Sequence, residues 1–594
     1  MGDLTAAIRL FRYPGGARPA LQDVYLDIAA GEFVVIAGPP GGGKTTLCHC
    51  LSGVIPHAVR GEYDGEVRIG SRLIPDLPLP RLAGLTGYVL QVPANQLFGL
   101  TVGEDVAFGP ENLGLPIAEV LRRRQTALAA VGIAHLVDRA PHTLSGGEQQ
   151  RAVLAAQLAL DPDVLIFDQP VAELDPLGRD EVYASIRRLH RQLGKTIVVV
   201  EERLSEVLPL ATRVVVLEEG RVARDDAPAR LFADPAVFDL GLRVPHAVQL
   251  GCELRARGVD TGPEPLLTPQ DVIARFGARA MDADRDTAPA GGGGAAHGES
   301  APPNGGVVLC RIRDLGHRYP TGTWALRHVG LDVVAGECVA VVGANGAGKS
   351  TLARHIAALV RPTEGAVELA SEDGALHDIR RWTTARVSRS AGYLFQDPDY
   401  QIFADSVFDE TAFGLRVRRL PKEAIDVRVA TMLDRLGLRP FQDVHPYRLS
   451  RGQRQILALA SVLVLEPKLL VVDEPSTGLD FRQTVAIMDH LNAFRRAGNG
   501  VLLITHDIEM VTRYAQRVVV LDGGRLVLET ATARLAEHTP ALTAARIRLP
   551  DVFRVAAGLR LPLPEQPLSV SWVADQIARG VPGRTEEKEQ EVVT

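Results

Sequence analysis

A phosphate-binding pattern that occurs twice constrains this chain more than any other feature. The spacing GxxxxGK[ST] is found at residues 343–350, which read GANGAGKS, and at residues 38–45, which read GPPGGGKT. In each copy a buried-strand pattern precedes the glycines and a helical pattern follows them, which favours a phosphate-binding loop over an ordinary glycine-rich turn. Lys44 and Lys349 lie 305 positions apart. The sequence therefore predicts a duplication with one such loop in each half.

The residue types in both loops suit a bound polyphosphate. Glycines let backbone N–H groups point inward, the next helix presents its N-terminus to the anion, and the lysine places a positive charge near the outer phosphates. The hydroxyl after each lysine, on Thr45 or Ser350, is placed to hold Mg²⁺. The candidate phosphate-binding residues are Gly38, Gly41, Gly43, Lys44, Thr45 and Thr46 in the first copy and Gly343, Asn345, Gly346, Gly348, Lys349, Ser350 and Thr351 in the second.

Length and composition bound the class of protein. At 594 residues the chain is too long for one hydrophobic core, and 46% hydrophobic with 23% charged residues is typical of soluble globular domains. The net charge of -7 gives no electrostatic reason for nucleic acid as the main partner. No apolar run reaches the roughly 18 to 20 residues of a membrane span, and the N-terminus lacks a signal-peptide core. The five cysteines form no CxxC pair, so we expect two domains in a cytosolic protein without a cysteine metal site.

The repeat also predicts where the domains end. Residues 242–245 (LRVP) recur as residues 547–550 (IRLP), so each half continues past its motifs into a small C-terminal appendage. Residues 281–306 are rich in Gly, Ala and Pro and are expected to form a flexible linker with an r.m.s. span of about 28 Å. We therefore expect a first domain at 1–280, a second domain at 307–580 and a polar tail at 581–594.

Two pairs of polar residues match between the copies. Tyr13 and Tyr319 each precede a turn upstream of the loop, where the ring could stack on an adenine; a core or surface aromatic is the alternative for each. Gln91 and Gln396 each close an apolar strand pattern and open a loop, again 305 positions apart. A neutral amide at that position can reach Mg²⁺ or the attacking water while its loop contacts a partner.

A second glycine-containing segment opens a long helix in each half. Residues 144–151 read LSGGEQQR, and residues 449–455 read LSRGQRQ. Serine is a good N-cap, and a helix that starts with Ser and Gly is a second place where backbone N–H groups can meet a phosphate. The residues concerned are Ser145, Gly146 and Gly147 in the first copy and Ser450 and Gly452 in the second, where Arg451 replaces a glycine.

Acidic residues end the buried strand patterns that follow these helices. Asp168 and Asp473 stand at strand ends, where a carboxylate can hold Mg²⁺ through its hydration shell. The next residue, Gln169 in the first copy and Glu474 in the second, is well placed to orient or deprotonate water. Leu-Asp follows in both copies, at Asp175 and Asp480, and a later strand ends at His506 in the second copy.

In this order the motifs resemble those of the ATP-binding cassette (ABC) ATPases, over both halves. Residues 95–98 (NQLF), 104–112 (EDVAFGPEN), 400–403 (YQIF) and 410–414 (ETAFG) are similar, more narrowly, to the ATPase components of energy-coupling factor transporters, importers of vitamins and of cobalt or nickel. The resemblance implies an α/β fold of two tandem cassettes, each a RecA-like parallel-sheet core with an antiparallel β subdomain, a helical subdomain and a C-terminal appendage. It also implies a head-to-tail pair, each ATP lying between the loop of one half and the LSGGQ-type segment of the other.

The resemblance implies two unequal ATP sites. The second-half nucleotide would contact Lys349, Ser350, Thr351, Gln396, Asp473, Glu474 and His506, with Ser145, Gly146 and Gly147 from the first half, and the first-half nucleotide would contact Lys44, Thr45, Thr46, Gln91 and Asp168, facing Ser450 and Gly452. Mg²⁺ would be held by Ser350, Gln396 and Asp473, or by Thr45, Gln91 and Asp168. Where the second copy has His506, the first has Glu202 on an alignment with a one-residue gap, which the match of Arg213 with Arg517 at 304 positions supports; without the gap the counterpart is Glu201.

This comparison predicts one fast site and one slow or silent site. Glu474, His506, Gln396 and Lys349 would carry hydrolysis in the second half. In the first half the amide Gln169 stands in the place of the base, so that site would hold ATP as a structural clamp, unless another group serves as the base.

The function that the resemblance implies is a transport motor. It would be an ATPase at the cytoplasmic face of the membrane, peripheral, and docked near Gln91 and Gln396 on a separate transmembrane subunit, with a substrate-capture membrane subunit as a further partner. A soluble tandem cassette that acts on ribosomes or nucleic acid is the alternative from another class, but the linker lacks the basic charge expected of it. A tandem ATPase of a sugar-type importer would share the mechanism and differ in cargo.

Overall fold

The computed structural model describes residues 3–16, 18–172, 174, 176–283, 306–477, 479, 481–561 and 568–580. Nearly all of the expected linker, the tail at 581–594, and Asp175 and Asp480 lie outside these residues. The chain forms two compact units. Within the described residues, the first unit contains 3–283, 554–561 and 569–580, and the second contains 306–553 and Leu568.

The first unit is built around a six-stranded sheet. Its strands lie in the order β10 (Arg221–Asp226), β9 (Arg213–Glu218), β3 (Phe33–Ala37), β8 (Thr196–Val200), β7 (Val164–Asp168) and β6 (Thr86–Val89). All neighbours are parallel except β10, which pairs antiparallel with β9. A separate antiparallel sheet has the order β2 (Leu21–Ile28), β1 (Leu4–Arg12), β4 (Glu62–Ile69) and β5 (Arg72–Leu73).

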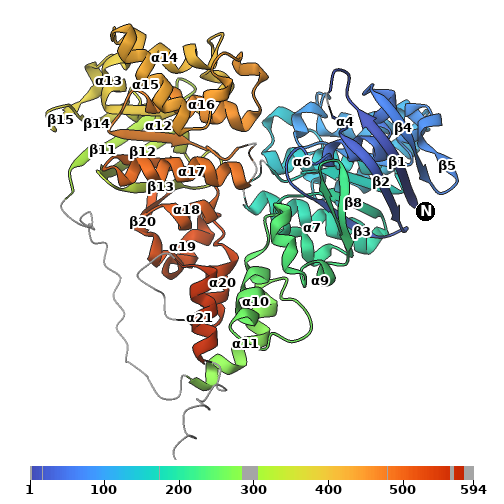
Figure 1. The fold of residues 1–594 in the computed structure, drawn as a ribbon. Coiled ribbons are helices and arrows are strands. Elements are labelled where there is room, and N and C mark those ends of the chain that lie inside the picture. Colours follow the sequence, from blue (N-terminus) through green and yellow to red (C-terminus); the bar gives the residue numbers. More distant parts are fainter. Residues whose placement is uncertain are drawn as a thin grey trace, which may run out of the picture. The chain divides into compact units, whose positions relative to one another are not determined.

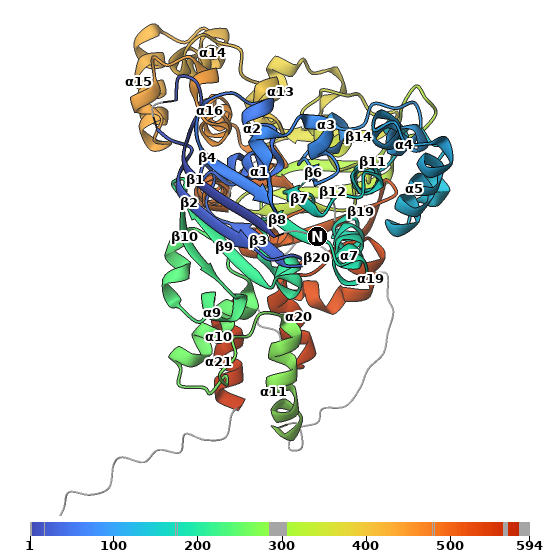
Figure 2. The same cartoon turned by 90° about the vertical axis from the view of Figure 1, so that its right-hand side faces the viewer.

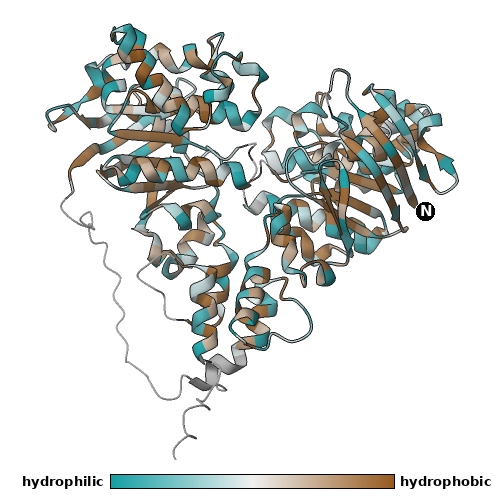
Figure 3. Ribbon diagram, viewed as in Figure 1, coloured by the Kyte–Doolittle hydropathy of each residue, from teal (hydrophilic) through white to brown (hydrophobic). Residues whose placement is uncertain are grey.

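Strand β3 shows why the central sheet forms where the apolar runs predict it. All five of its residues, FVVIA, are buried. Phe33, Val35 and Ala37 belong to one apolar cluster and Val34 and Ile36 to another, because successive side chains of a strand point to opposite faces. A continuous apolar strand therefore serves two cores, one on each face of the sheet, and Figure 3 shows hydrophobic residues concentrated on the strands.

Helices of the first unit surround this sheet and add a helical subdomain (Figure 1). The helices are α1 (Lys44–Ser52), α2 (Val54–His57), α3 (Leu79–Leu82), α4 (Val102–Asn112), α5 (Ile117–Ala130), α6 (Gly146–Ala159), α7 (Pro176–Leu193), α8 (Leu204–Val207), α9 (Pro228–Leu231), α10 (His246–Ala256) and α11 (Pro269–Ala283). Helices α4, α5 and α6 pack on one another and make up the helical subdomain.

The second unit repeats this plan. Its central sheet has the order β16 (Ala391–Leu394), β17 (Leu469–Asp473), β18 (Gly500–Ile504), β13 (Cys338–Val342), β19 (Arg517–Asp522) and β20 (Arg525–Ala531), and its antiparallel sheet has the order β12 (Trp324–Val334), β11 (Val308–Arg318), β14 (Glu364–Ala370) and β15 (Leu376–Asp378). Its helices are α12 (Lys349–Ile356), α13 (Thr384–Ser390), α14 (Val407–Val417), α15 (Lys422–Arg435), α16 (Arg451–Leu463), α17 (Phe481–Arg496), α18 (Ile508–Tyr514) and α19 (Thr539–Ala544).

The order of elements confirms the predicted α/β fold with a parallel-sheet core, an antiparallel β subdomain and a helical subdomain in each half. Strand β7 begins 305 positions before β17, but β8 begins 304 positions before β18. The one-residue gap therefore lies between these strands, where α7 has 18 residues and α17 has 16.

The packing of the C-terminal helices does not follow the expected domain boundaries. The end of α20 (Asp551–Gly558) and all of α21 (Val570–Gly580) belong to the first unit, so a second domain that runs from 307 to 580 does not describe the observed packing. Helix α21 lies against α10 and α11, as Figures 1 and 2 both show. The reason is burial: Val573, Ala574 and Ile577 form one apolar face of α21 and are almost fully buried.

Polar contacts fix the same helix at its edge. The Arg257 guanidinium, just after α10, donates from Nε to Asp575 Oδ1 at 2.7 Å and from Nη2 to Ser571 Oγ at 2.7 Å. These partners are more than 300 positions away in the sequence. The last described helix of the chain is therefore part of the helical appendage that follows the first phosphate loop.

Candidate nucleotide-binding site

Each phosphate loop connects the central strand of its sheet to the helix that follows. In the first unit the loop joins β3 to α1, and in the second it joins β13 to α12. Lys44 Nζ donates to the carbonyl oxygens of Gly38 and Pro39 at 2.8 and 2.9 Å. Lys349 Nζ donates to Gly343 and Ala344 at 2.8 and 3.0 Å, so both loops curl around a buried ammonium in the same way.

Two glycines in each loop have specific reasons to be glycine. A Cβ at Gly38 would lie 2.0 Å from the carbonyl oxygen of Leu217, and one at Gly343 would lie 2.2 Å from that of Leu521. Gly41 and Gly346 have open space around them but adopt φ of 73° and 80°, in the left-handed region that side chains disfavour. At Gly38 and Gly343 there is no room for a side chain, and at Gly41 and Gly346 the backbone conformation disfavours one. Glycine at these positions lets the loop wrap around an anion.

The strand-terminal aspartates lie beside the hydroxyl that follows each lysine. Ser350 Oγ donates to Asp473 Oδ1 at 3.2 Å, and Tyr393 Oη donates to Asp473 Oδ2 at 3.0 Å. Burial raises the pKa of Asp473, although both hydrogen bonds act in the other direction. In the first unit Asp168 is arranged similarly, with Tyr88 Oη at 3.3 Å and the Thr45 hydroxyl as a second donor, and burial likewise raises its pKa.

These donors fit a magnesium ion. A buried carboxylate with a raised pKa beside a hydroxyl is a site where a hard cation would offset the cost of burial, and oxygen donors of this kind suit Mg²⁺. An ion between the Ser350 hydroxyl and the Asp473 carboxylate would take further ligands from phosphate and water. Among the described residues, no group of three or more His, Cys, Asp or Glu side chains forms a metal site.

Glu474 and His506 form a pair in the second unit. Glu474 follows β17 with φ of 46°, its N–H donates to Ile504, and its side chain is buried. His506 Nδ1 lies 2.9 Å from Glu474 Oε2, and the His506 backbone N–H also donates to that oxygen at 3.3 Å. A partly buried carboxylate with a fixed orientation is suited to accept a proton from water.

The first unit has a different pair at the same positions. Gln169 follows β7 with φ of 49°, and its Nε2 donates to Glu202 Oε1 at 3.1 Å. That oxygen also lies 3.8 Å from Lys44 Nζ. The register shows that Glu202 is the counterpart of His506, because Glu201 N–H donates to Ile36 just as Thr505 N–H donates to Val341.

Glu201 has a structural role instead. Its carboxylate is buried, accepts a 2.6 Å hydrogen bond from Tyr183 Oη, and also accepts from the backbone N–H groups of residues 202 and 203. Burial raises its pKa, with these hydrogen bonds opposing the shift. It thereby holds the start of the segment that carries Glu202.

The two tyrosines upstream of the loops are tied to the helices that follow them. Tyr13 Oη lies 3.1 Å from Thr46 Oγ1, and Tyr319 Oη lies 3.1 Å from Thr351 Oγ1. The edge of each ring packs on a neighbour, Phe11 or His317. Both rings thus lie beside the first turn of the phosphate-loop helix, and stacking on an adenine stays a prediction.

Gln91 and Gln396 are exposed just beyond β6 and β16, as the strand patterns predict. Neighbouring residues that were not among the predicted site residues hold these loops. Gln96 ties the first loop to the end of β6, donating to Tyr88 O at 2.9 Å and accepting from Leu90 N at 2.7 Å. In the second unit Gln401 donates to Ala458 O at 2.8 Å. The matched NQ and YQ dipeptides were the available signal.

The serine-containing segments begin α6 and α16 as expected. Ser145 is the N-cap of α6 and forms a capping box with Glu148, and Ser450 forms one with Gln453 at the start of α16. Ser145 and Gly146 are exposed, as are Ser450 and Arg451, whereas Gly147 and Gly452 are buried. Each helix therefore presents an open N-terminus, and the Arg451 replacement is compatible with it.

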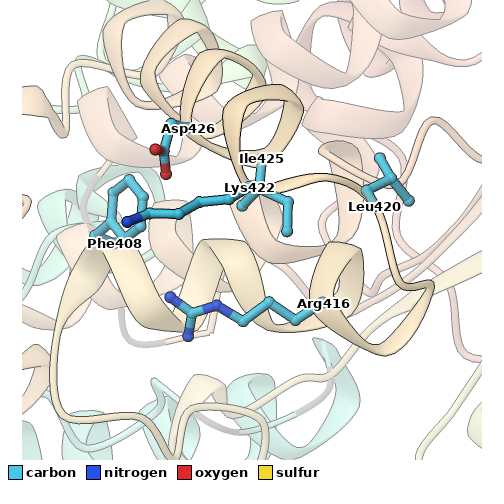
Figure 4. Close-up of a pocket in the computed structure, with 6 residues that line it drawn as sticks. All are labelled: Phe408, Arg416, Leu420, Lys422, Ile425 and Asp426. Carbon is cyan, nitrogen blue, oxygen red and sulfur yellow. The ribbon is translucent and has the colours of Figure 1, made fainter.

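A separate pocket lies in the helical subdomain of the second unit. It has a volume of about 330 Å³ and is lined by Phe408, Arg416, Leu420, Lys422, Ile425 and Asp426 (Figure 4). These residues come from α14, α15 and the turn between them, and none belongs to the predicted nucleotide sites. The pocket therefore contributes nothing to the chemistry at the phosphate loop.

Comparison with known proteins identifies the family. The family model described as ABC transporter matches residues 21–172 and 326–477, one match in each unit. A protein of Methanosarcina mazei named "Putative ABC transporter ATP-binding protein" is 37% identical over 93% of this chain and 92% of its own length. One of Vibrio parahaemolyticus with a similar name is 32% identical over 92% of both chains. This chain belongs to the ABC transporter family.

The chain is also similar to a solved structure of cbiO1 from Clostridium perfringens, which is part of the ABC transporter complex cbiONQ. That protein is 32% identical, and the match covers 42% of this chain and 99% of that one with a TM-score of 0.37. As an ABC ATPase, the protein binds ATP and couples its hydrolysis to transport. None of the helices in the described part of the chain is long and apolar enough to span a membrane.

Proposed function

We propose that this ABC ATPase energises a membrane importer of a vitamin or a transition-metal ion, with hydrolysis concentrated at the phosphate loop of the second unit. The observation that carries the proposal is the complete set of groups at that loop. Lys349 lies in its loop, Ser350 is hydrogen-bonded to Asp473, and Glu474 is paired with His506. The importer class is supported by the narrower motif resemblance in the loops after Gln91 and Gln396.

Within the second unit each residue has a distinct role. Lys349 and the loop N–H groups bind the phosphates, and Ser350 with Asp473 would hold Mg²⁺, which supplies charge stabilisation at the phosphates when bound. Glu474 accepts the proton of the attacking water, while His506 fixes the carboxylate from its Nδ1 side. Gln396, exposed at the end of its strand, orients the water and reports to the partner.

The first unit retains binding groups but not the base. Gln169 can orient water through its amide but cannot accept a proton near neutral pH, which typically costs about 10²- to 10⁴-fold in rate. Lys44, Thr45 and Asp168 remain in place. The first site is therefore slow, and turnover belongs to the second.

The partner is a separate membrane subunit, which receives the conformational change that ATP binding and hydrolysis cause in the ATPase. Exposed aromatic pairs follow the glutamine loops in both units: Phe98 packs edge-on against Phe108 at 4.5 Å between ring centres, and Phe403 against Phe413 at 4.7 Å. Apolar surface of this kind, repeated at matching positions, suits an apolar face of a membrane subunit's cytoplasmic segment.

Turnover measurements on the full chain with its membrane subunit test the proposal. We expect Glu474→Gln to lower ATP hydrolysis by about 10²-fold or more. The matched change Gln169→Glu should alter hydrolysis by less than about threefold, since the second site already dominates. Equal losses from Glu474→Gln and from a Lys44 substitution that spares nucleotide binding at the second site would overturn the unequal assignment, and failure of the chain to co-purify with a membrane protein would overturn the transport role.

A further inference from the structure

We propose that Glu202 makes the nucleotide site of the first unit selective for a nucleoside diphosphate over the triphosphate. The proposal rests on the proposed function in one respect, that the first phosphate loop binds a nucleotide. It goes beyond the loss of the base at Gln169, because it concerns which nucleotide the site retains and not how fast the site turns over.

The Glu202 carboxylate lies close to the lysine of the first phosphate loop. Its Oε1 lies 3.8 Å from Lys44 Nζ and accepts the 3.1 Å hydrogen bond from Gln169 Nε2. The Lys44 side chain is 6% exposed and that of Glu202 is 32% exposed, so the ammonium is enclosed while the carboxylate borders the open side of the site. The negative charge therefore stands beside the ammonium that an outer phosphate would contact.

In the second unit, which has the complete set of catalytic groups, His506 occupies the position of Glu202. Its Nδ1 lies 2.9 Å from Glu474 Oε2. In the first unit the residue after the strand-terminal aspartate is the amide Gln169, and the carboxylate of the pair is on Glu202, near Lys44. The site has thus lost a base at Gln169 and gained a fixed negative charge at Glu202.

The Glu202 carboxylate repels the phosphates of a bound nucleotide, and it repels a triphosphate more than a diphosphate. The outermost phosphate of a triphosphate brings negative charge to the lysine, where it competes with a carboxylate already about 4 Å from the same ammonium. A diphosphate places less charge there and is held mainly by the loop N–H groups. We expect the affinity for ATP relative to ADP to be about tenfold lower at this site than in the second unit.

Equilibrium titration of the full chain with fluorescent ADP, and with ATP as competitor, tests the proposal. The variant Lys349→Ala disables the second loop, so that binding reports the first. Adding Glu202→Gln keeps a side chain of the same shape that can still accept from Gln169, but removes the charge. We expect ATP affinity to rise about tenfold and ADP affinity to change less than about threefold. Glu119→Gln, which removes a carboxylate charge at a half-buried position of α5, is the control and should change neither.

The reciprocal exchange gives a second, independent readout. In a Lys44→Ala chain, which leaves the second loop, Glu474→Gln combined with His506→Glu should lower ATP affinity about tenfold relative to ADP, compared with Glu474→Gln alone. An unchanged ATP-to-ADP ratio in Glu202→Gln, or an equal change in both affinities, would overturn the selectivity. A Lys349→Ala chain that melts normally yet binds neither nucleotide would overturn nucleotide binding at the first loop as well. The transport role is judged separately, by co-purification of the full chain with a membrane protein.

Discussion

At the scale of single residues, the two nucleotide sites differ by where one carboxylate stands. Asp168 and Asp473, Lys44 and Lys349, and the tyrosines beside each loop make matching hydrogen bonds in the two units. The neighbouring pair is Gln169 with Glu202 in one unit and Glu474 with His506 in the other. These two side chains carry the difference in chemistry that we propose, which the backbone does not show.

Asp473 makes the stability of the metal-free second unit depend on pH. Burial raises its pKa in the folded state, so the folded state binds more protons than the unfolded state as pH rises above the ordinary aspartate value. The free energy of unfolding therefore falls with increasing pH over the window from that ordinary value to the raised one. In Asp473→Asn this contribution is absent, so the variant should become more stable relative to the native chain as pH increases through the window.

Urea unfolding followed by tryptophan fluorescence measures this, because Trp324 and Trp382 both lie in the second unit. Added Mg²⁺ with nucleotide should reduce the difference at the upper end of the window, since the cation stabilises the ionised carboxylate. A stability difference between Asp473→Asn and the native chain that is constant across pH would contradict the account.

The glycines of the second loop give a graded prediction. Gly343→Ala places a methyl group 2.2 Å from the Leu521 carbonyl oxygen, so the loop must move, and we expect nucleotide binding at that site to be lost. Gly346→Ala meets no atom within 4 Å and only imposes an unfavourable φ of 80°, which costs about 1 kcal/mol. Binding titrations in a Lys44→Ala chain compare the two. Equal losses would show that φ, and not the clash, controls the loop.

At the scale of elements, buried carboxylates hold the loops that carry the exposed aromatic residues. Asp105 on α4 accepts from the N–H groups of Phe98 and Gly99, each at 2.9 Å. Glu410 on α14 accepts from Phe403 and Ala404 at 3.0 and 2.9 Å. Each loop that exposes an apolar side chain is thereby fixed to the helix that follows it.

Substitution of the exposed aromatics should weaken the membrane subunit's attachment. We expect Phe98→Ser with Phe403→Ser to reduce co-purification of that subunit at least about tenfold, because each ring is more than 60% exposed and its apolar surface is available to a partner. Leu121→Ser, at an exposed apolar position on α5, is the matched control. Undiminished co-purification of the double variant would place the docking surface elsewhere.

At the scale of the whole molecule, the last described helix belongs to the unit that the N-terminal part of the chain builds. Helix α21 buries Val573 and Ile577 against α10 and α11, and Arg257 holds its edge through Asp575. The stability of the first unit is therefore tied to residues that follow the second one. Truncation near residue 561 should affect the first unit even though its sequence repeat would remain intact.

A single substitution tests this dependence. Val573 is fully buried, so Val573→Asp places a charge in an apolar contact and should cost about 3 kcal/mol or more. We expect a lower melting temperature for the transition seen by fluorescence of Trp572, which lies on the same helix. Arg579→Asp, at an exposed position of α21, should leave that transition nearly unchanged. A Val573→Asp chain with an unaltered transition would contradict the packing.

Much of the site could be read from motifs because its residues are local. A phosphate loop needs glycines at fixed spacing between a strand and a helix, and both loops have them, at Gly38 and Gly343. The α/β order also follows from alternating apolar strands and periodic helices. The counterpart of His506 is predicted to be Glu202, because Arg213 matches Arg517 at 304 positions and so supports a one-residue gap. Strand pairing agrees with this alignment and separates Glu202 from the ungapped alternative, Glu201.

The sequence by itself determined the duplication, the fold class and the difference between Gln169 and Glu474, since each is written in residue types at fixed spacing. Only the tertiary structure decided that Glu202 stands 3.8 Å from Lys44 and that α21 packs beside α10. The physical reason is the same in both cases. Contacts between segments far apart in the chain depend on burial and strand register, which the spacing of motifs does not encode.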